Sequence, residues 1–343
     1  MPASAIAIRD GIVSHPASGN RSGFGALAAA AADQPVPTEP FLKEPSEFRL
    51  IGKARLRRKD GAAKCNGSAI FTQDVRLPNM LTAVVAHPPL FGAAARGFDD
   101  RAARAIQGVQ QVVQIHSGVA VLGLDFWSAK RGRDALVTDW DDSAAFKQSS
   151  DEILSDFRKL AEQPSKPART DGEASEAMNE AMTLIEAEYS VPYLAHAAPM
   201  ECMDCVMEPA GDGGVRVING EQFQTIDQQA IADVLGIVPE RVHIEMLYAG
   251  GSFGRRANPS SDYLIETAQM LKASGGKQPV KLAWTREENM RAGWYRPLYL
   301  HRLKAGLDGN GRPIAWQQRI VGQSIVLGTA VEQSNFQDYL VLR

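Results

Sequence analysis

The chain has 343 residues, a hydrophobic content of 44% and a net charge of −3 at pH 7. This length predicts two or three domains with a buried core, and the charge gives no indication of nucleic-acid binding. No stretch approaches the about 18 consecutive apolar residues of a membrane span. The N-terminus carries no recognisable export signal. The three cysteines and six scattered histidines predict neither a disulfide framework nor a metal site.

The first half of the chain shows a change of pattern near residue 49. Residues 1–48, rich in Ala, Ser, Gly and Pro, are expected to be an extended segment. From there to residue 145, strands alternate with short helices, which predicts an α+β unit. The expected strands are 81–87, 112–115, 119–124 and 137–140, and the expected helices are 99–106 and 127–136.

A helix and a linker separate this unit from a second one. Residues 149–162 have the spacing of an amphipathic helix, and 163–175 are polar with two prolines. The second unit begins near Met182. Its glycine-rich turns at 211–214 and 308–311 predict two hairpins.

The most informative stretch is 249–256, which reads Ala-Gly-Gly-Ser-Phe-Gly-Arg-Arg. It follows an alternating strand at 241–247 and precedes a helical pattern at 262–272. Glycines let the backbone turn sharply and present N–H groups, which together with Arg255 and Arg256 suit a phosphate. A glycine turn with two solvated arginines is the alternative.

Other polar residues are weaker candidates when each is taken alone. His196 and Glu201 flank a proline, and Gln222 and Gln224 precede a helix that ends near Leu235. Thr225 or Asp227 is expected to cap that helix, and Thr285 with Glu288 forms a capping box. We find no nucleophile triad, no Walker lysine and no G-x-G-x-x-G pattern.

Five segments in order nevertheless resemble the large subunit of the molybdenum hydroxylases, the xanthine dehydrogenase and aldehyde oxidase family. The resemblance is strongest to the isoquinoline 1-oxidoreductase beta-subunit branch, which includes membrane-type aldehyde dehydrogenases. It rests on residues 59–89, 191–202, 220–229, 248–263 and 280–313.

The resemblance implies an α+β fold, with an α/β hammerhead domain followed by a partial molybdopterin-binding domain. The domain boundaries are then an N-terminal segment 1–48, the hammerhead domain 49–145, a helix and linker 146–180, the cofactor domain 181–330 and a remnant strand 331–343. The implied cofactor-binding residues are Gly250, Gly251, Ser252, Phe253, Gly254, Arg255, Gln222, Gln224 and His196, with Glu201 near the metal.

The implied reaction is hydroxylation of an aldehyde or N-heterocycle, with water as the oxygen source. The implied cofactor is molybdenum held by molybdopterin, in its cytosine dinucleotide form in this branch. The implied partners are a [2Fe–2S] subunit and a cytochrome c subunit, and the implied compartment is the periplasm. Without an export signal, the chain as written is expected to stay in the cytoplasm.

The chain also departs from the family pattern. It has Leu194 in place of a glutamine and Arg256-Ala257 in place of Lys-Glu. The general-base glutamate of the family is not found, so no catalytic residue is assigned and the chain is expected to be incomplete. A catalytically inactive fragment that serves as a scaffold is therefore the alternative function.

Overall fold

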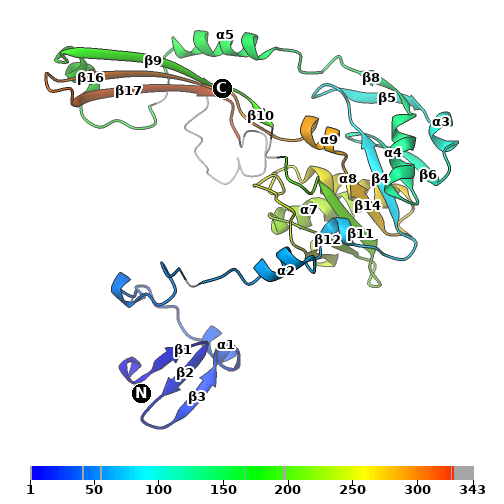
Figure 1. The fold of residues 1–343 in the computed structure, drawn as a ribbon, viewed down its shortest axis with the longest axis horizontal. Coiled ribbons are helices and arrows are strands. Elements are labelled where there is room, and N and C mark those ends of the chain that lie inside the picture. The colour runs from blue at the N-terminus through cyan, green and yellow to red at the C-terminus, as the bar shows by residue number, and fades with distance from the viewer. Residues whose placement is uncertain are drawn as a thin grey trace. The chain divides into compact units, whose positions relative to one another are not determined.

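The computed structural model describes residues 2–40, 42–54, 56–165, 167–195, 198–325 and 327, and it divides into two compact units, residues 1–65 and 66–343. The first unit contains a small antiparallel sheet and a helix (Figure 1). Its elements are η1 (Ala3–Ala5), β1 (Ala7–Arg9), β2 (Ile12–His15), β3 (Asn20–Gly23), α1 (Phe24–Ala32), η2 (Pro45–Glu47) and α2 (Gly61–Asn66), which ends one residue beyond the unit.

The expectation of an extended segment is therefore wrong for residues 7–32. Asp10 and Gly11 both have positive φ, 51° and 76°. An Asp-Gly pair in this conformation is a strong hairpin signal, because its twist matches that of the flanking strands. The alanine-rich stretch that follows forms α1, in agreement with the high helix propensity of alanine.

The second unit is built around a seven-stranded mixed sheet with the order β13-β12-β11-β14-β4-β7-β6. In chain order these strands are β4 (Leu81–Ala86), β6 (Val109–Ile115), β7 (Gly118–Gly123), β11 (Asp204–Pro209), β12 (Val215–Asn219), β13 (Val242–Met246) and β14 (Val280–Ala283). The helices around the sheet are α3 (Arg101–Arg104), α4 (Phe126–Asp134), α7 (Gln224–Leu235), α8 (Asp262–Ala273) and α9 (Arg286–Arg291).

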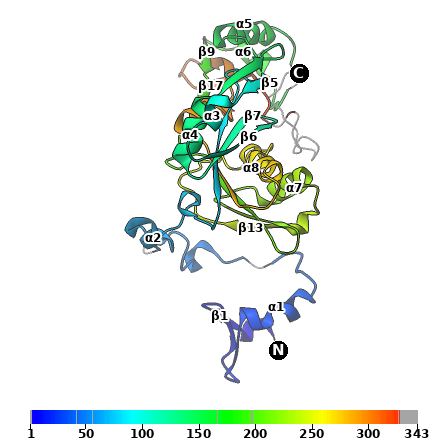
Figure 2. The ribbon, with the colours of Figure 1, turned by 90° about the vertical axis from the view of Figure 1, so that its right-hand side faces the viewer.

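Helices cover this sheet on two faces, as β7 illustrates. Ala120 and Leu122 belong to a large core that includes α7 and α8, whereas Val119 and Val121 belong to a smaller core with α3. Successive side chains of a strand point to opposite faces, so both faces of β7 are buried. Figure 2 shows α7 and α8 side by side on one face of the sheet.

The sheet runs through both sequence segments that were expected to be separate domains. β4 pairs in parallel with β14, with Leu81 opposite Val280, and antiparallel with β7 on its other side. The strands of 49–145 and of 181–330 thus share one sheet. The proposed boundaries stay a prediction, but β4 of the first segment is hydrogen-bonded directly to β14 of the second.

A second sheet, β17-β16-β9, is long and antiparallel (Figure 1). It consists of β9 (Thr183–Val191), β16 (Tyr299–Leu307) and β17 (Pro313–Gly322), and both expected glycine hairpins are present, at β11–β12 and β16–β17. The expected amphipathic helix is α5 (Ser150–Ala161), with a capping box between Ser149 and Glu152. It packs Ile153 and Phe157 against Leu300 and Val321.

The remaining elements are short. They are η3 (Thr72–Asp74), β5 (Ala94–Asp99), β8 (Val137–Asp141), α6 (Ala174–Asn179), β10 (Leu194–Ala195), η4 (Pro239–Arg241) and β15 (Tyr295–Arg296). Across the described ranges, every helix is too short or too polar to cross a bilayer. The expected strand at 331–343 lies outside the described residues.

Candidate functional site

The glycine stretch 249–256 is a loop between β13 and α8, in agreement with the strand–loop–helix prediction. Gly251, Phe253 and Gly254 have positive φ of 93°, 51° and 90°. Within the described part of the chain, the N–H groups of residues 251–254 donate to no protein acceptor. The Phe253 side chain is 78% exposed. The loop therefore presents a run of free backbone donors, which is the chemistry of an anion-binding nest.

The segment 220–224 lies at the same edge of the sheet as this loop. β12 and β13 are parallel neighbours, with Asn219 opposite Met246, so the chain leaves both strands on one side. A Cβ atom on Gly220 would lie 2.8 Å from the Cα of Ala249. Such close backbone contact requires glycine and brings the two segments together.

Glu201 holds the start of the glycine loop through two hydrogen bonds to Gly250. Its Oε2 accepts the N–H of Gly250 at 2.7 Å, and its own N–H donates to the Gly250 carbonyl at 3.2 Å. A Cβ on Gly250 would lie only 2.5 Å from the Glu201 Cβ. Glu201 is buried, so its position in the structure is that of a loop anchor.

Both arginines of the loop are enclosed rather than presented to a ligand. Arg255 donates to both carboxylate oxygens of Asp262, at 3.2 and 2.6 Å, and its side chain is fully buried. Arg256 contacts Glu201 at 3.2 Å and Asp204 at 2.9 Å. The alternative of two solvated arginines is therefore wrong, because nearby carboxylates enclose and neutralise both. The sequence did not reveal this, since those acids lie in other segments or appeared to be surface residues. A role of Arg255 at a cofactor phosphate stays a prediction.

Asp204 extends this buried network toward η3. Its Oδ2 accepts the Gln73 side-chain amide at 2.6 Å. Burial raises the pKa of Asp204 to about 7, against the opposing effect of Arg256. The network joins the glycine loop to Gln73, which precedes it by about 180 positions.

A buried acid pair behind the loop was missed by the sequence analysis. Asp227 does not cap α7; its Oδ1 instead accepts the Ser261 hydroxyl at 2.6 Å, and its Oδ2 has no hydrogen-bond partner among the described residues. Glu221 is 5% exposed, and among the described residues only the Asn219 side chain acts on its carboxylate as a hydrogen-bonding group. Burial, and next the nearby charge of Asp227, raises the pKa of Glu221 to about 8. Burial raises the pKa of Asp227 to about 7. The sequence signals are one acid just after a strand, Glu221, and one in the first turn of the following helix, Asp227.

The remaining candidates are less well defined. Gln222 is exposed, and Gln224 directs its side-chain amide at the Met246 sulfur at 3.0 Å, a weak acceptor. Thr285 caps α9 through the Glu288 N–H, but the Glu288 carboxylate bonds to His87 and Arg133. His196 lies outside the described residues. The roles of these residues at a cofactor stay predictions.

A family model described as the molybdopterin cofactor-binding domain matches residues 159–330, which is half of the chain and includes the glycine loop. The chain belongs to this family. The chain is also 32% identical over 314 residues to isoquinoline 1-oxidoreductase subunit beta of Brevundimonas diminuta, covering 88% of this chain and 39% of that protein. It is 31% identical to the membrane-bound aldehyde dehydrogenase [pyrroloquinoline-quinone] of Gluconacetobacter polyoxogenes, covering 79% and 36%.

Solved structures support the fold. Quinoline 2-oxidoreductase from Pseudomonas putida 86 matches with a TM-score of 0.62 at 15% identity, over 78% of this chain and 38% of that one. The aldehyde oxidoreductase from Desulfovibrio gigas matches with a TM-score of 0.60 at 16% identity, over 77% and 34%. The mixed α and β architecture is thus confirmed. The chain spans about two fifths of the length of the curated relatives named above.

Proposed function

We propose that this chain supplies the molybdopterin-binding part of a molybdenum-dependent oxidoreductase, one that hydroxylates an aldehyde or an N-heterocycle with water as the oxygen source. The observation that carries the proposal is the run of N–H groups at 251–254 that find no acceptor among the described residues, inside the region matched by the cofactor-domain family. The names of the curated relatives, an isoquinoline oxidoreductase subunit and an aldehyde dehydrogenase, support the substrate class.

The donor set of the loop fits the phosphate end of such a cofactor. Successive N–H groups in a loop with positive φ form a concavity that binds anions without needing a cationic side chain. Molybdopterin, when bound, would supply the molybdenum redox chemistry. Glu201 and Arg256 would hold the loop in its binding shape, and Asp262 would fix Arg255 behind it.

The assembly around the chain is part of the same proposal. Electrons would leave through a [2Fe–2S] subunit and then a cytochrome c subunit, and the cofactor would carry a cytosine nucleotide. The periplasm is the proposed compartment. The relatives include proteins named as subunits, which supports an assembly of several chains.

Two glycine variants test the loop. Gly254→Ala places a side chain at φ +90°, and Gly236→Ala does the same at φ +72° at the end of α7; neither new Cβ would meet another atom within 4 Å. Both changes cost about 1–2 kcal/mol of local strain, but only the first alters the loop.

The measurement is molybdenum and phosphorus content of the full chain purified from a host that makes molybdopterin. Nucleotide analysis after acid release identifies a cytosine form, and aldehyde-dependent dye reduction reports activity. We expect Gly254→Ala to retain about tenfold less cofactor than Gly236→Ala, as 1.4 kcal/mol predicts. Equal retention by the two variants would refute the assignment of the loop.

The sequestered arginines favour a second candidate, a scaffold that keeps the fold and binds partner chains without the metal. Arg255 and Arg256 are both committed to internal ion pairs, so neither guanidinium group is presented to a ligand at the loop. A molybdenum-free, inactive wild-type chain that still binds a [2Fe–2S] subunit would favour this candidate.

A further inference from the structure

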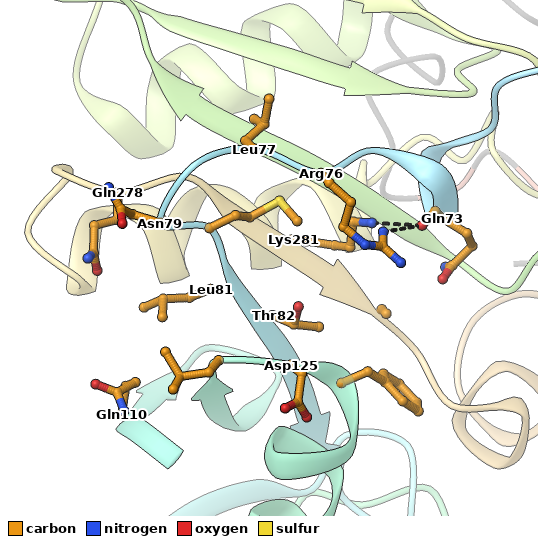
Figure 3. Close-up of a pocket in the computed structure, with 14 residues that line it drawn as sticks. Gln73, Arg76, Leu77, Asn79, Leu81, Thr82, Gln110, Asp125, Gln278 and Lys281 are labelled. Carbon is orange, nitrogen blue, oxygen red and sulfur yellow. Dashed lines mark hydrogen bonds between the residues drawn. The ribbon is translucent and has the colours of Figure 1, made fainter. Parts of the chain in front are cut away.

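A pocket of about 480 Å³ opens in the second unit, between the segment 73–82, β14 and the turn that leads into α4 (Figure 3). This volume falls in the range of small-molecule sites, about 300–1,000 Å³. Its walls come from four stretches that are far apart in the sequence: 73–82, Gln110, 124–126 and 278–283. None of the residues predicted to bind the cofactor lines it.

Two cationic side chains lie together in one wall of this pocket. Arg76 donates to the carbonyls of Gln73 and Val75 at 2.5 and 2.8 Å, and Lys281 donates to the same two oxygens at 2.9 and 2.7 Å. Figure 3 shows both side chains directed at Gln73. Two like charges on two shared neutral acceptors repel each other.

No carboxylate among the described residues contacts either cation within ion-pair distance. Lys281 is 3% exposed. Burial, and next the Arg76 guanidinium, lowers the pKa of Lys281 to about 8, while the more distant Asp204, Asp74 and Glu201 act in the opposite direction. A buried charge without a counterion is costly, and an incoming anion would relieve that cost.

The rest of the pocket is suited to the body of an organic molecule. Leu77, Leu81 and Phe126 supply apolar surface, and Gln110 and Gln278 supply amides. The one carboxylate of the lining, Asp125, already accepts the Ser128 N–H at 2.7 Å as the cap of α4. The pocket therefore has a cationic wall, and its remainder combines apolar side chains with neutral amides.

We propose that this pocket binds an organic carboxylate, with its charged end at Arg76 and Lys281 and its apolar body against Leu81 and Phe126. The guanidinium and ammonium groups would replace part of their shared carbonyl contacts with ionic hydrogen bonds, which are stronger. The assignment is independent of the proposed cofactor function, because it uses none of the glycine-loop residues.

Isothermal titration of the full chain with benzoate, benzamide and inorganic phosphate tests the proposal. The variants are Arg76→Gln, on the exposed side chain, and Lys281→Met, which keeps the aliphatic stem. Arg312→Gln is the matched control, because this exposed arginine lies in the β16–β17 hairpin and does not line the pocket. Circular dichroism verifies that each variant folds. If Lys281→Met does not fold, Arg76→Gln alone is sufficient to test the proposal.

We expect benzoate to bind the wild-type chain and the Arg312→Gln control equally, and Arg76→Gln to bind it about tenfold more weakly, the effect of 1.4 kcal/mol. Benzamide has the same shape as benzoate but no charge. It should bind the wild-type chain at least as weakly as benzoate binds Arg76→Gln. Equal binding of benzoate and benzamide, tighter binding of phosphate than of benzoate, or no effect of Arg76→Gln would each overturn the proposal.

Discussion

His87 is the residue whose loss should most clearly destabilise the second unit. Its Nε2 lies 2.7 Å from Glu266 on α8, and its Nδ1 lies 2.9 Å from Glu288 on α9. The imidazole thus connects the end of β4 with two helices formed some 180–200 residues later in the chain. Burial would lower its pKa, but the two carboxylates raise the pKa of His87 to about 10.

The structure sets the size of the effect. Removing one member of a buried ionic network leaves uncompensated charge and costs about 3–5 kcal/mol. In His87→Leu, Glu266 keeps the Ser117 hydroxyl and the Trp284 indole as donors, and Glu288 keeps Arg133. Because these donors remain, the cost should lie at the lower end of the range of about 3–5 kcal/mol. We therefore expect His87→Leu to lower the free energy of unfolding by about 3 kcal/mol.

The pH of the measurement follows from the direction of the pKa shift. The pKa of His87 is higher in the folded chain than in the unfolded one, so its protonation stabilises the fold fully below about pH 6.5. That contribution is lost as the pH rises through about 10. At pH 7 most of it is present, and pH 7 is therefore the condition to use.

Urea unfolding of His87→Leu, followed by tryptophan fluorescence, measures the change, since the His87 and Trp284 rings lie 4.8 Å apart. His116→Asn is the matched control: this histidine is exposed and bonds only Gln269, also on α8. We expect the control to stay within about 0.5 kcal/mol of the wild type. A loss below about 1 kcal/mol in His87→Leu, or an equal loss in both variants, would refute the reasoning.

Three further outcomes are expected. Because the pKa values of Glu221 and Asp227 are raised to about 8 and 7, the folded chain binds more protons than the unfolded chain above pH 5, so stability should fall as the pH rises from 5 to 8. Each group should contribute at most about 1.4 kcal/mol per pH unit to this slope, and Glu221→Gln should remove only the contribution of Glu221 in a series of melting curves. Gly250→Ala, whose Cβ would meet Glu201 at 2.5 Å, should destabilise the loop by about 1–3 kcal/mol in hydrogen exchange, whereas unchanged exchange would argue against the close packing. Limited proteolysis at 163–175 should leave both pieces associated in gel filtration, since they share one sheet. Separate elution of the two pieces would contradict this.

Much of the local structure could be predicted because its causes are local. The amphipathic helix α5 follows from the spacing of Ile153 and Phe157, and the hairpins follow from their glycines. The position of the glycine loop between a strand and a helix was also correct. Its free N–H groups follow directly from a backbone that turns through positive φ at Gly251 and Gly254.

What could not be predicted depends on distant partners. Arg255 and Arg256 are typical of a phosphate site in sequence, but Asp262 and Asp204 neutralise them in the fold. Asp227 looks like a helix cap, yet it is buried against Ser261. No spacing rule shows which acid folds back on which base, because that information lies in the tertiary contacts.

The parallel pairing of β4 with β14 has a consequence for how the chain is made on the ribosome. Leu81 of β4 cannot pair until Val280 of β14 has been synthesised, about 200 residues later. At a translation rate of about 5–20 residues per second, this delay is about 10–40 s. During that interval β7 can protect one side of β4, but the other side stays open to any neighbouring polypeptide. Successful production of the protein should therefore depend on chaperones or on a low synthesis temperature, which limits encounters between nascent chains.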